Sequence, residues 1–228
     1  MKVKKSIIVF APHPDDETWG CGGTIAKRIS EGYEILIVIM TDGRYAFLKM
    51  LGIETDPTPE ELKEIRKEEV KRALRILGVL ENNLIFLDFV DGTLKDNMEE
   101  AEKKVTEILR GHHPVEVYYP YKNDGHQDHQ ATYKVVKNSI AKLGLQTRCY
   151  QYSIMHKWAR FGPIIDRMLS LFKGNVVKVD ISPFLTVKVI AAKEFKSELT
   201  TISSKQSNPI AKDVERYLRK NEIFYIDK

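Results

Sequence analysis

Short apolar runs alternate along this chain with longer segments of helical periodicity, and this alternation constrains the fold most. The strand-like runs cover residues 6–11, 33–40, 84–88, 115–119 and 147–152. The helical segments between them cover residues 18–31, 58–77, 98–110 and 130–143. Alternation of this kind is typical of βαβ units, in which right-handed crossovers connect parallel strands. The sequence therefore predicts an α/β fold with a Rossmann-like, mostly parallel sheet and helices on both faces.

A single domain over residues 1–228 is predicted. No stretch of the 228 residues is rich enough in Gly, Ser or Pro to act as a linker, and no internal repeat occurs. Thr58, Pro59 and Glu61 have the pattern of a capping box that starts a helix. A loop is expected over residues 41–57, and short helices with strands at 176–180 and 223–226 would complete the domain.

Composition excludes several classes of partner. The 36 Lys and Arg against 32 Asp and Glu give a net charge of +4, too weak a bias to predict binding to nucleic acid or to an anionic membrane. The 2 cysteines, Cys21 and Cys149, cannot form a disulfide framework. No apolar run approaches the roughly 20 residues of a membrane span, and no signal-peptide pattern precedes the first strand. We expect a cytoplasmic protein with no membrane or nucleic-acid partner.

Two polar clusters follow predicted strands. His13-Pro14-Asp15-Asp16-Glu17 comes directly after the first strand, and His126-Gln127-Asp128-His129 lies in the loop after the fourth. Open α/β sheets form their sites in the crevice at the carboxyl ends of the strands. Both clusters are therefore expected at the same edge of the sheet.

The residue types in these clusters suit a catalytic metal. Two imidazoles and one carboxylate would hold zinc by three ligands and leave the fourth position to water, as in catalytic zinc sites. One of the adjacent Asp15 and Asp16 could bind the metal while the other takes a proton from water. The spacing does not fix which does which. Two His and one carboxylate also form the facial triad of iron(II) oxygenases, and a metal pocket without turnover is a third alternative.

Other polar or small residues near the clusters have structural interpretations. Glu17 is expected to favour the helix N-terminus rather than to bind metal. Gly20, Gly22 and Gly23 are expected to let the helix approach the sheet, because the pattern lacks the third glycine of a dinucleotide loop. Cys21 is expected to be buried and inert. The remaining histidines, which we assign to surface or packing roles, are His112, His113 and His156.

Taken together, the five-residue and four-residue motifs resemble those of the PIG-L/LmbE-like family of zinc-dependent N-deacetylases. The resemblance covers most of the chain and departs from the commoner second motif by Gln127, where Pro is frequent. It implies His13, Asp16 and His129 as zinc ligands and Asp15 as general base. It also implies His126 as the acid or oxyanion stabiliser, with Asp128 orienting His126 or a neighbour.

The resemblance implies a substrate class as well. Family substrates are N-acetylglucosamine-containing small molecules or oligosaccharides, from which metal-activated water removes the acetyl group. The alternative is an amidase acting on a related sugar conjugate. Arg66 matches a family position linked to substrate binding, although its charged helix could equally present it to solvent. Tyr121 and Trp158 could stack on a sugar or pack in the core, and a homo-oligomer is compatible with the family.

Overall fold

The computed structural model describes residues 5–154, 176–211, 214 and 218–226. The strands are β1 (Ser6–Ala11), β2 (Glu34–Thr41), β3 (Leu84–Phe89), β4 (Glu116–Pro120), β5 (Arg148–Tyr152), β6 (Val176–Asp180) and β7 (Asn221–Ile226). The α-helices are α1 (Asp16–Ser30), α2 (Ala46–Leu51), α3 (Pro59–Leu77), α4 (Met98–His112), α5 (Gln127–Leu143), α7 (Leu185–Ala192) and α8 (Lys196–Leu199). Short 3-10 helices are η1 (Glu81–Asn83), η2 (Leu94–Asn97) and η4 (Ser182–Phe184).

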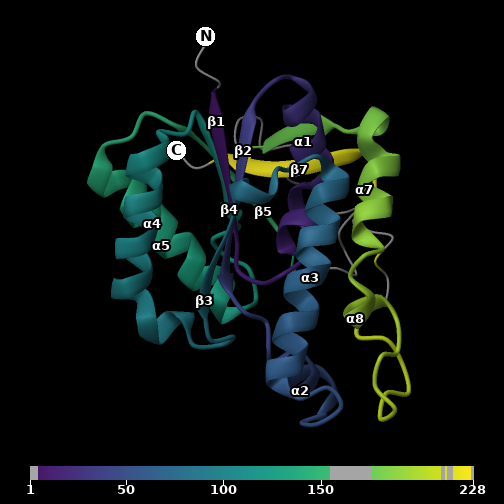
Figure 1. Cartoon of the computed structure of the whole chain (residues 1–228). Helices are drawn as coiled ribbons and strands as arrows, with labels where there is room; N and C mark the ends of the chain where they lie inside the picture. Colours follow the sequence, from purple (N-terminus) through teal and green to yellow (C-terminus); the bar gives the residue numbers. More distant parts are fainter. Residues whose placement is uncertain (1–4, 155–175, 212–213, 215–217, 227–228) are drawn as a thin grey trace.

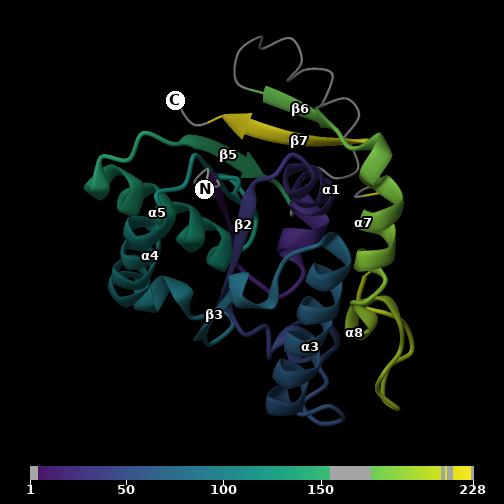
Figure 2. The ribbon, with the colours of Figure 1, turned by 45° about the horizontal axis from the view of Figure 1, so that its top comes forward.

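The strands form one sheet in the order β3-β2-β1-β4-β5-β7-β6. Strands β1 to β5 pair in parallel, whereas β7 is antiparallel to both β5 and β6. Figure 2 shows β5, β7 and β6 lying side by side at one end of the molecule. The predicted α/β fold with a mostly parallel sheet is confirmed.

Helices cover both faces of the sheet (Figure 1). Helices α4 and α5 pack together on one face, and α1, α3 and α7 lie on the other. Each face has its own apolar cluster, and successive residues of β1 alternate between them: Ile7 and Val9 in one, Ile8 and Phe10 in the other. Because both faces are buried, the strand is a continuous apolar run, as buried parallel strands usually are.

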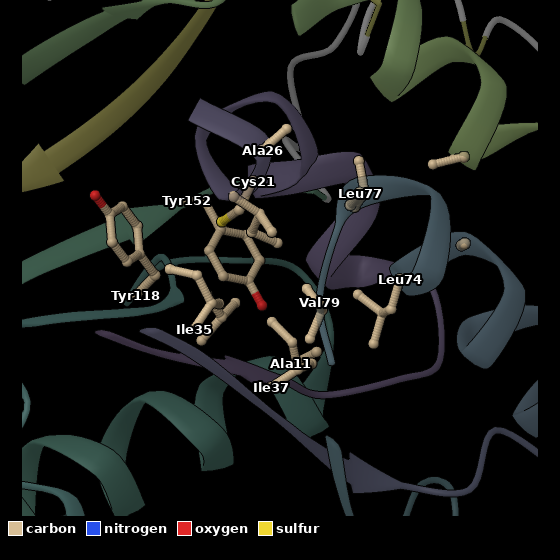
Figure 3. Close-up of a cluster of buried hydrophobic side chains, with 14 of the residues drawn as sticks. Ala11, Cys21, Ala26, Ile35, Ile37, Leu74, Leu77, Val79, Tyr118 and Tyr152 are labelled. Atoms are coloured by element: carbon tan, nitrogen blue, oxygen red, sulfur yellow. The ribbon is translucent and has the colours of Figure 1, made fainter. Parts of the chain in front are cut away.

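The glycines of α1 permit close packing against the neighbouring elements. A Cβ atom added at Gly20 would lie 2.5 Å from the Tyr152 ring, and one at Gly23 would lie 2.3 Å from Ile181. Figure 3 shows Cys21 and Tyr152 within the apolar cluster beneath this helix. The packing interpretation of these glycines and the burial of Cys21 are therefore confirmed.

Several element boundaries differ from the sequence prediction. The helix expected from residue 130 begins at Gln127, so Asp128 and His129 lie on its first turn and not in a loop. The N-cap is His126, whose side chain accepts from the Asp128 N–H, and histidine is not among the usual N-cap residues. The short helix α2 occupies part of the predicted loop. The capping box of Thr58 and Glu61 is confirmed.

Within the described residues, every helix is either too short or too polar to cross a bilayer.

Candidate active site

The two polar clusters meet where the adjacent strands β1 and β4 end. His13 follows β1 and Asp16 begins α1, whereas β4 leads through a loop to His129 on the first turn of α5. The strand order reverses beside β1, because β2 and β3 extend the sheet on one side and β4 and β5 on the other. Such a switch point leaves a crevice at the carboxyl ends of the strands. Both clusters therefore lie at the carboxyl-terminal edge of the sheet, as predicted.

Three ligand atoms form a compact triangle at this edge. Asp16 Oδ2 lies 3.2 Å from His13 Nδ1 and 3.2 Å from His129 Nε2, and the two nitrogens are 3.3 Å apart. Ligand atoms held at about 2.0–2.2 Å by one zinc ion stand roughly 3.0–3.5 Å from each other. The donor set and its spacing therefore fit a metal ion, and the carboxylate beside both imidazoles belongs to Asp16.

The electrostatics of the triangle also favour a cation. Burial opposes a charge on His129, but the carboxylates of Asp16 and Asp124 outweigh it and raise its pKa to about 10. Burial likewise opposes the negative charge of Asp16, but His129 and His13 hold the pKa of this carboxyl far below its usual range. The carboxylates thus stabilise a positive charge on His129, which is the sign of charge that a metal ion would bring once it displaced the proton.

Outer carboxylates hold the two imidazoles. Asp128 Oδ2 lies 3.2 Å from His13 Nε2 and accepts from the Gly92 N–H at 2.7 Å. Asp124 Oδ2 lies 3.4 Å from His129 Nδ1. Carboxylates in this position fix the tautomer and orientation of metal-binding histidines. Asp128 was expected to orient His126 or a neighbour; its carboxylate contacts the neighbour His13, and its backbone N–H donates to His126 Nδ1.

Asp15 lies outside the triangle but lines the same cavity as its three residues. Its φ of 128° is a conformation that residues other than glycine rarely adopt. The Asp15 N–H donates to Glu17 Oε2 at 3.0 Å, and Asp15 Oδ2 lies 3.4 Å from the guanidinium of Arg66. Burial and the nearby Glu198 carboxylate raise the pKa of Asp15 well above its usual value, although Arg66 opposes the shift. Asp15 is thus a buried carboxyl group beside the metal ligands, free of the ligand triangle.

Glu17 shapes the turn that carries these residues. Its carboxylate is fully buried and accepts from the Asp15 N–H and from the Thr18 hydroxyl at 2.7 Å. Burial raises the pKa of Glu17 to about 7. The carboxylate lies in the first turn of α1 and binds groups of that turn, as expected for a residue that supports the helix N-terminus.

His126 lies beside the triangle at the N-cap of α5. Its ring meets that of His13 edge-on, with centroids 4.6 Å apart, and its Nδ1 accepts from the Asp128 N–H at 3.2 Å. Burial and then the charges of His13 and His129 lower the pKa of His126 to about 4. With Nδ1 as acceptor, the neutral ring carries its proton on Nε2 and offers a hydrogen-bond donor.

Arg66 is buried, so the solvent-facing interpretation of this residue is wrong. It is 4% exposed, and its guanidinium donates to the Pro14 carbonyl at 2.7 Å and to Glu198 Oε1 at 2.7 Å. It also lines a cavity of about 400 Å³, whose lining includes the three residues of the triangle. Tyr121 is absent from the described lining of this cavity, and its ring packs against Tyr225 with centroids 4.4 Å apart. Substrate contact by either residue stays a prediction.

Sequence reasoning missed four charged residues of the site. Asp91 Oδ1 lies 3.6 Å from His13 Nε2 and pairs with Lys49 Nζ at 2.7 Å. The other two are Asp124, which lies beside His129, and Glu198, which pairs with Arg66. Asp91 follows β3, so its place after a predicted strand was a usable signal. Lys49 and Glu198 carry none, because α2 and α8 are short and weakly patterned.

The remaining histidines were assigned outside the site. His112 and His113 end α4 and are exposed. His156 lies outside the described residues, as does Trp158.

The chain is similar to a known protein family and to several known proteins. Residues 8–140 match the family described as PIG-L: GlcNAc-PI de-N-acetylase. The chain is 27% identical to the uncharacterized deacetylase YaiS of Escherichia coli, over 85% of this chain and 92% of that protein. It is 34% identical to diacetylchitobiose deacetylase of Thermococcus kodakarensis, over 55% of this chain and 45% of that protein.

A solved structure agrees with the sequence relatives. The N,N'-diacetylchitobiose deacetylase of Pyrococcus horikoshii, solved with an inhibitor, matches with a TM-score of 0.72 and 25% identity. The match covers 99% of this chain and 85% of that one. Two groups of side chains here have ligand atoms within 4.8 Å of one another: His13, His126 and His129, and His13, Asp91, His126 and Asp128. Together with the relatives, they indicate a metal-dependent hydrolase of the N-deacetylase class. Since the family match spans more than half of the sequence, the chain belongs to the PIG-L family of de-N-acetylases.

Proposed function

We propose that this protein is a zinc-dependent hydrolase that removes the N-acetyl group from a small molecule containing N-acetylglucosamine. The observation that carries the proposal is the triangle of His13, Asp16 and His129, with the carboxyl of Asp15 lining the same cavity outside the triangle. Membership of a family of de-N-acetylases supports the reaction class. Relatives that act on amino sugars support a small-molecule substrate.

His13, Asp16 and His129 would hold the zinc ion. When bound, zinc lowers the pKa of water to about 7 and polarises the amide carbonyl. Asp128 and Asp124 keep the two imidazoles in the orientation that presents one nitrogen of each to the metal. Asp15, which lines the same cavity outside the ligand triangle, is the group that we assign to proton transfer.

Asp15 serves as general base and then as general acid. It accepts a proton from the water whose oxygen bonds to the carbonyl carbon, and it passes a proton to the nitrogen when the C–N bond breaks. Acetate and a free amine result. A buried carboxyl with a raised pKa suits this double role, because an acid-base group works best near the pH of the reaction. Such a group contributes roughly 10²–10⁴-fold to the rate.

His126 stabilises the oxyanion that forms on the carbonyl oxygen. As a neutral ring with Nδ1 held by the Asp128 N–H, it has its Nε2–H available to donate to that oxygen. Removal of one such donor typically lowers kcat by about 10²–10³-fold. The resemblance allowed either an acid or an oxyanion stabiliser here, and the low pKa favours the second role.

The test measures acetate release from N-acetylglucosamine derivatives by zinc-loaded protein, with a chelator-treated sample alongside. We expect acetate that disappears with the chelator and returns with zinc. Release of a different acid from a related conjugate would favour the amidase alternative. Oxygen consumption with a keto acid, and no acetate, would favour an iron(II) oxygenase. Tight sugar binding without turnover by fully metal-loaded protein would indicate a binding role.

A further inference from the structure

An acidic residue from the later part of the chain lines the cavity that holds the ligand triangle. Glu198 lies in α8, outside the residues 8–140 that match the family, and lines the same cavity as Asp15. Glu198 is only 9% exposed, although its side chain ends in a carboxyl group. Glutamate is almost never buried to this extent unless it is paired. Its burial therefore points to a specific contact with another charged group.

That contact is with Arg66, and it connects Glu198 to Asp15. Arg66 Nη2 donates to Glu198 Oε1 at 2.7 Å. The same nitrogen donates to the carbonyl of Pro14, the residue directly before Asp15, at 2.7 Å. Asp15 Oδ2 lies farther from this nitrogen, at 3.4 Å. One nitrogen of a buried guanidinium thus stands between the two acidic side chains.

A second polar contact fixes α8 on α3, and the two helices lie beside each other in Figure 1. The Ser197 N–H and hydroxyl donate to the two carboxylate oxygens of Glu69 at 2.8 and 2.6 Å. Ser197 and Glu69 are both buried. Because Arg66 and Glu69 are three residues apart on α3, they lie on the same side of that helix. The neighbouring Glu198 is thereby held at a fixed place beside Arg66.

Asp15 stands beside the guanidinium without taking a hydrogen from Nη2. This nitrogen carries two hydrogens, and its two contacts at 2.7 Å are to Glu198 and to the Pro14 carbonyl. Without Glu198, one N–H of a buried guanidinium would lose its acceptor, which is costly. Asp15 Oδ2 is the carboxylate oxygen placed to replace it, by a shift of the side chain toward Arg66.

We propose that Glu198 is a positioning residue: by accepting an N–H of Arg66, it keeps the Asp15 carboxyl out of a closed pair with that arginine and open to the cavity. This role rests on the proposed function, in which Asp15 transfers the proton. Glu198 acts through Arg66 and lies outside the ligand triangle. Its effect is therefore on the rate of the reaction and not on metal binding.

The first experiment removes or conserves the acceptor at position 198 in zinc-loaded protein. In Glu198→Ala we expect kcat for acetate release to fall by about 10–100-fold, because a misplacement of about 1 Å can cost about 100-fold. Zinc content and KM should stay close to those of the wild type. Glu198→Gln keeps an oxygen that accepts from Arg66, although more weakly than a carboxylate. We expect it to restore kcat to within about fivefold of the wild type.

Glu194→Ala is the matched control. Glu194 lies four residues before Glu198 and also pairs with an arginine of α3, Arg72, at 2.9 Å. Both Glu194 and Arg72 lie outside the described lining of the cavity. Each alanine variant thus removes one contact between this segment and α3, but only one of them borders Asp15. Glu194→Ala should leave kcat and KM unchanged.

A second measurement needs no turnover. Asp15→Ala is made in the wild type, in Glu198→Ala and in Glu194→Ala, and unfolding constants are obtained from denaturant titrations. We expect Asp15→Ala to raise the unfolding constant roughly threefold more in Glu198→Ala than in the wild type, because Asp15 has become the acceptor for Arg66 there. In Glu194→Ala its effect should equal that in the wild type.

Three outcomes would overturn the inference: a kcat as low in Glu198→Gln as in Glu198→Ala, an equal loss in Glu194→Ala, or additive effects of Asp15→Ala and Glu198→Ala on unfolding. Failure of the proposed function has a separate signature, since the wild-type protein would then release no acetate from any N-acetylglucosamine derivative. The unfolding constants would still decide whether Glu198 keeps Asp15 apart from Arg66.

Discussion

The neighbouring residues Asp15 and Asp16 place their carboxylates in different surroundings because their backbone conformations differ. Helix α1 begins at Asp16, which places that side chain beside both imidazoles. Asp15, at the N-cap, has a φ of 128° that sends its side chain toward Arg66 instead. The backbone thereby separates the two carboxylates, and this separation is what we propose to divide metal binding by Asp16 from proton transfer by Asp15.

Replacing Asp15 should separate metal binding from catalysis. Asp15→Asn removes the acid-base group but leaves the ligand triangle intact, so we expect full zinc content and a loss of about 10²–10⁴-fold in kcat. His129→Ala removes a ligand and should lose zinc and activity together. Metal content and acetate release are measured on the same samples. Equal loss of zinc from both variants would show that Asp15 is a ligand.

We expect the outer carboxylates of Asp128 and Asp124 to increase the affinity of the site for zinc. Asp128→Asn and Asp124→Asn weaken the contacts to His13 and His129, and changes of this kind typically cost about 10–100-fold in metal affinity. Competition with a chelating dye measures the effect. Asp88→Asn is the control, because Asp88 is exposed and pairs with Lys67 on the surface. If all three variants bind zinc alike, the outer carboxylates play no part in holding it.

The ligand-bearing residues could be predicted from sequence because they occur in compact clusters after strands. That the two clusters meet needed only the motifs and the expectation that parallel strands end at one edge, whereas the choice of Asp16 over Asp15 as the ligand came from the family resemblance. Glu198 is an isolated acid, for which a solvated side chain is the ordinary interpretation, whereas Asp91 follows a predicted strand and Asp124 lies two residues before the second cluster. Their place in the site depends on which strands are neighbours and on how α8 packs, which a single sequence does not specify.

At the scale of elements, prediction succeeded where capping or apolar periodicity was strong. Helix α3 has a capping box at Thr58 and a glycine, Gly78, in the left-handed conformation at its end. Helix α2 was missed, since it has six residues and no side-chain cap. The start of α5 was placed late because His126 caps it. Because His126 stands at the N-cap in place of the usual Ser, Thr, Asp or Asn, the sequence lacked the ordinary signal for the start of α5.

The contact between α1 and Ile181 should make Gly23 intolerant of a side chain. A Cβ atom there would lie 2.3 Å from Ile181, and overpacking of this kind costs about 1–3 kcal/mol. Gly23→Ala should therefore lower the free energy of unfolding in a denaturant titration.

A second glycine provides the control for this change. A Cβ atom at Gly111, in α4, would meet nothing within 4 Å. Gly111→Ala should be neutral or stabilising by up to about 1 kcal/mol, because alanine favours the helix. Equal effects of the two substitutions would mean that helix propensity, and not packing, dominates at Gly23.

On the scale of the whole molecule, the later part of the chain completes the sheet. Strand β7 lies between β5 and β6, and Glu222 on β7 accepts from the Gly23 and Thr24 N–H groups of α1. Lys188 of α7 pairs with the same carboxylate at 2.6 Å, and both side chains are buried. We propose that the described residues unfold as one domain, because this pair ties α1, α7 and β7 together.

The buried pair provides the test of that proposal. Glu222→Ala leaves the Lys188 ammonium buried without its carboxylate, so we expect a loss of about 3–5 kcal/mol in the free energy of unfolding. Glu68→Ala, which breaks the exposed pair with Lys71, should change stability by less than about 1 kcal/mol. Circular dichroism and zinc retention are followed through the same denaturant titration. If the domain is single, Glu222→Ala shifts both transitions together to lower denaturant. A metal centre that keeps its zinc while the rest of the chain unfolds would divide the molecule into two units.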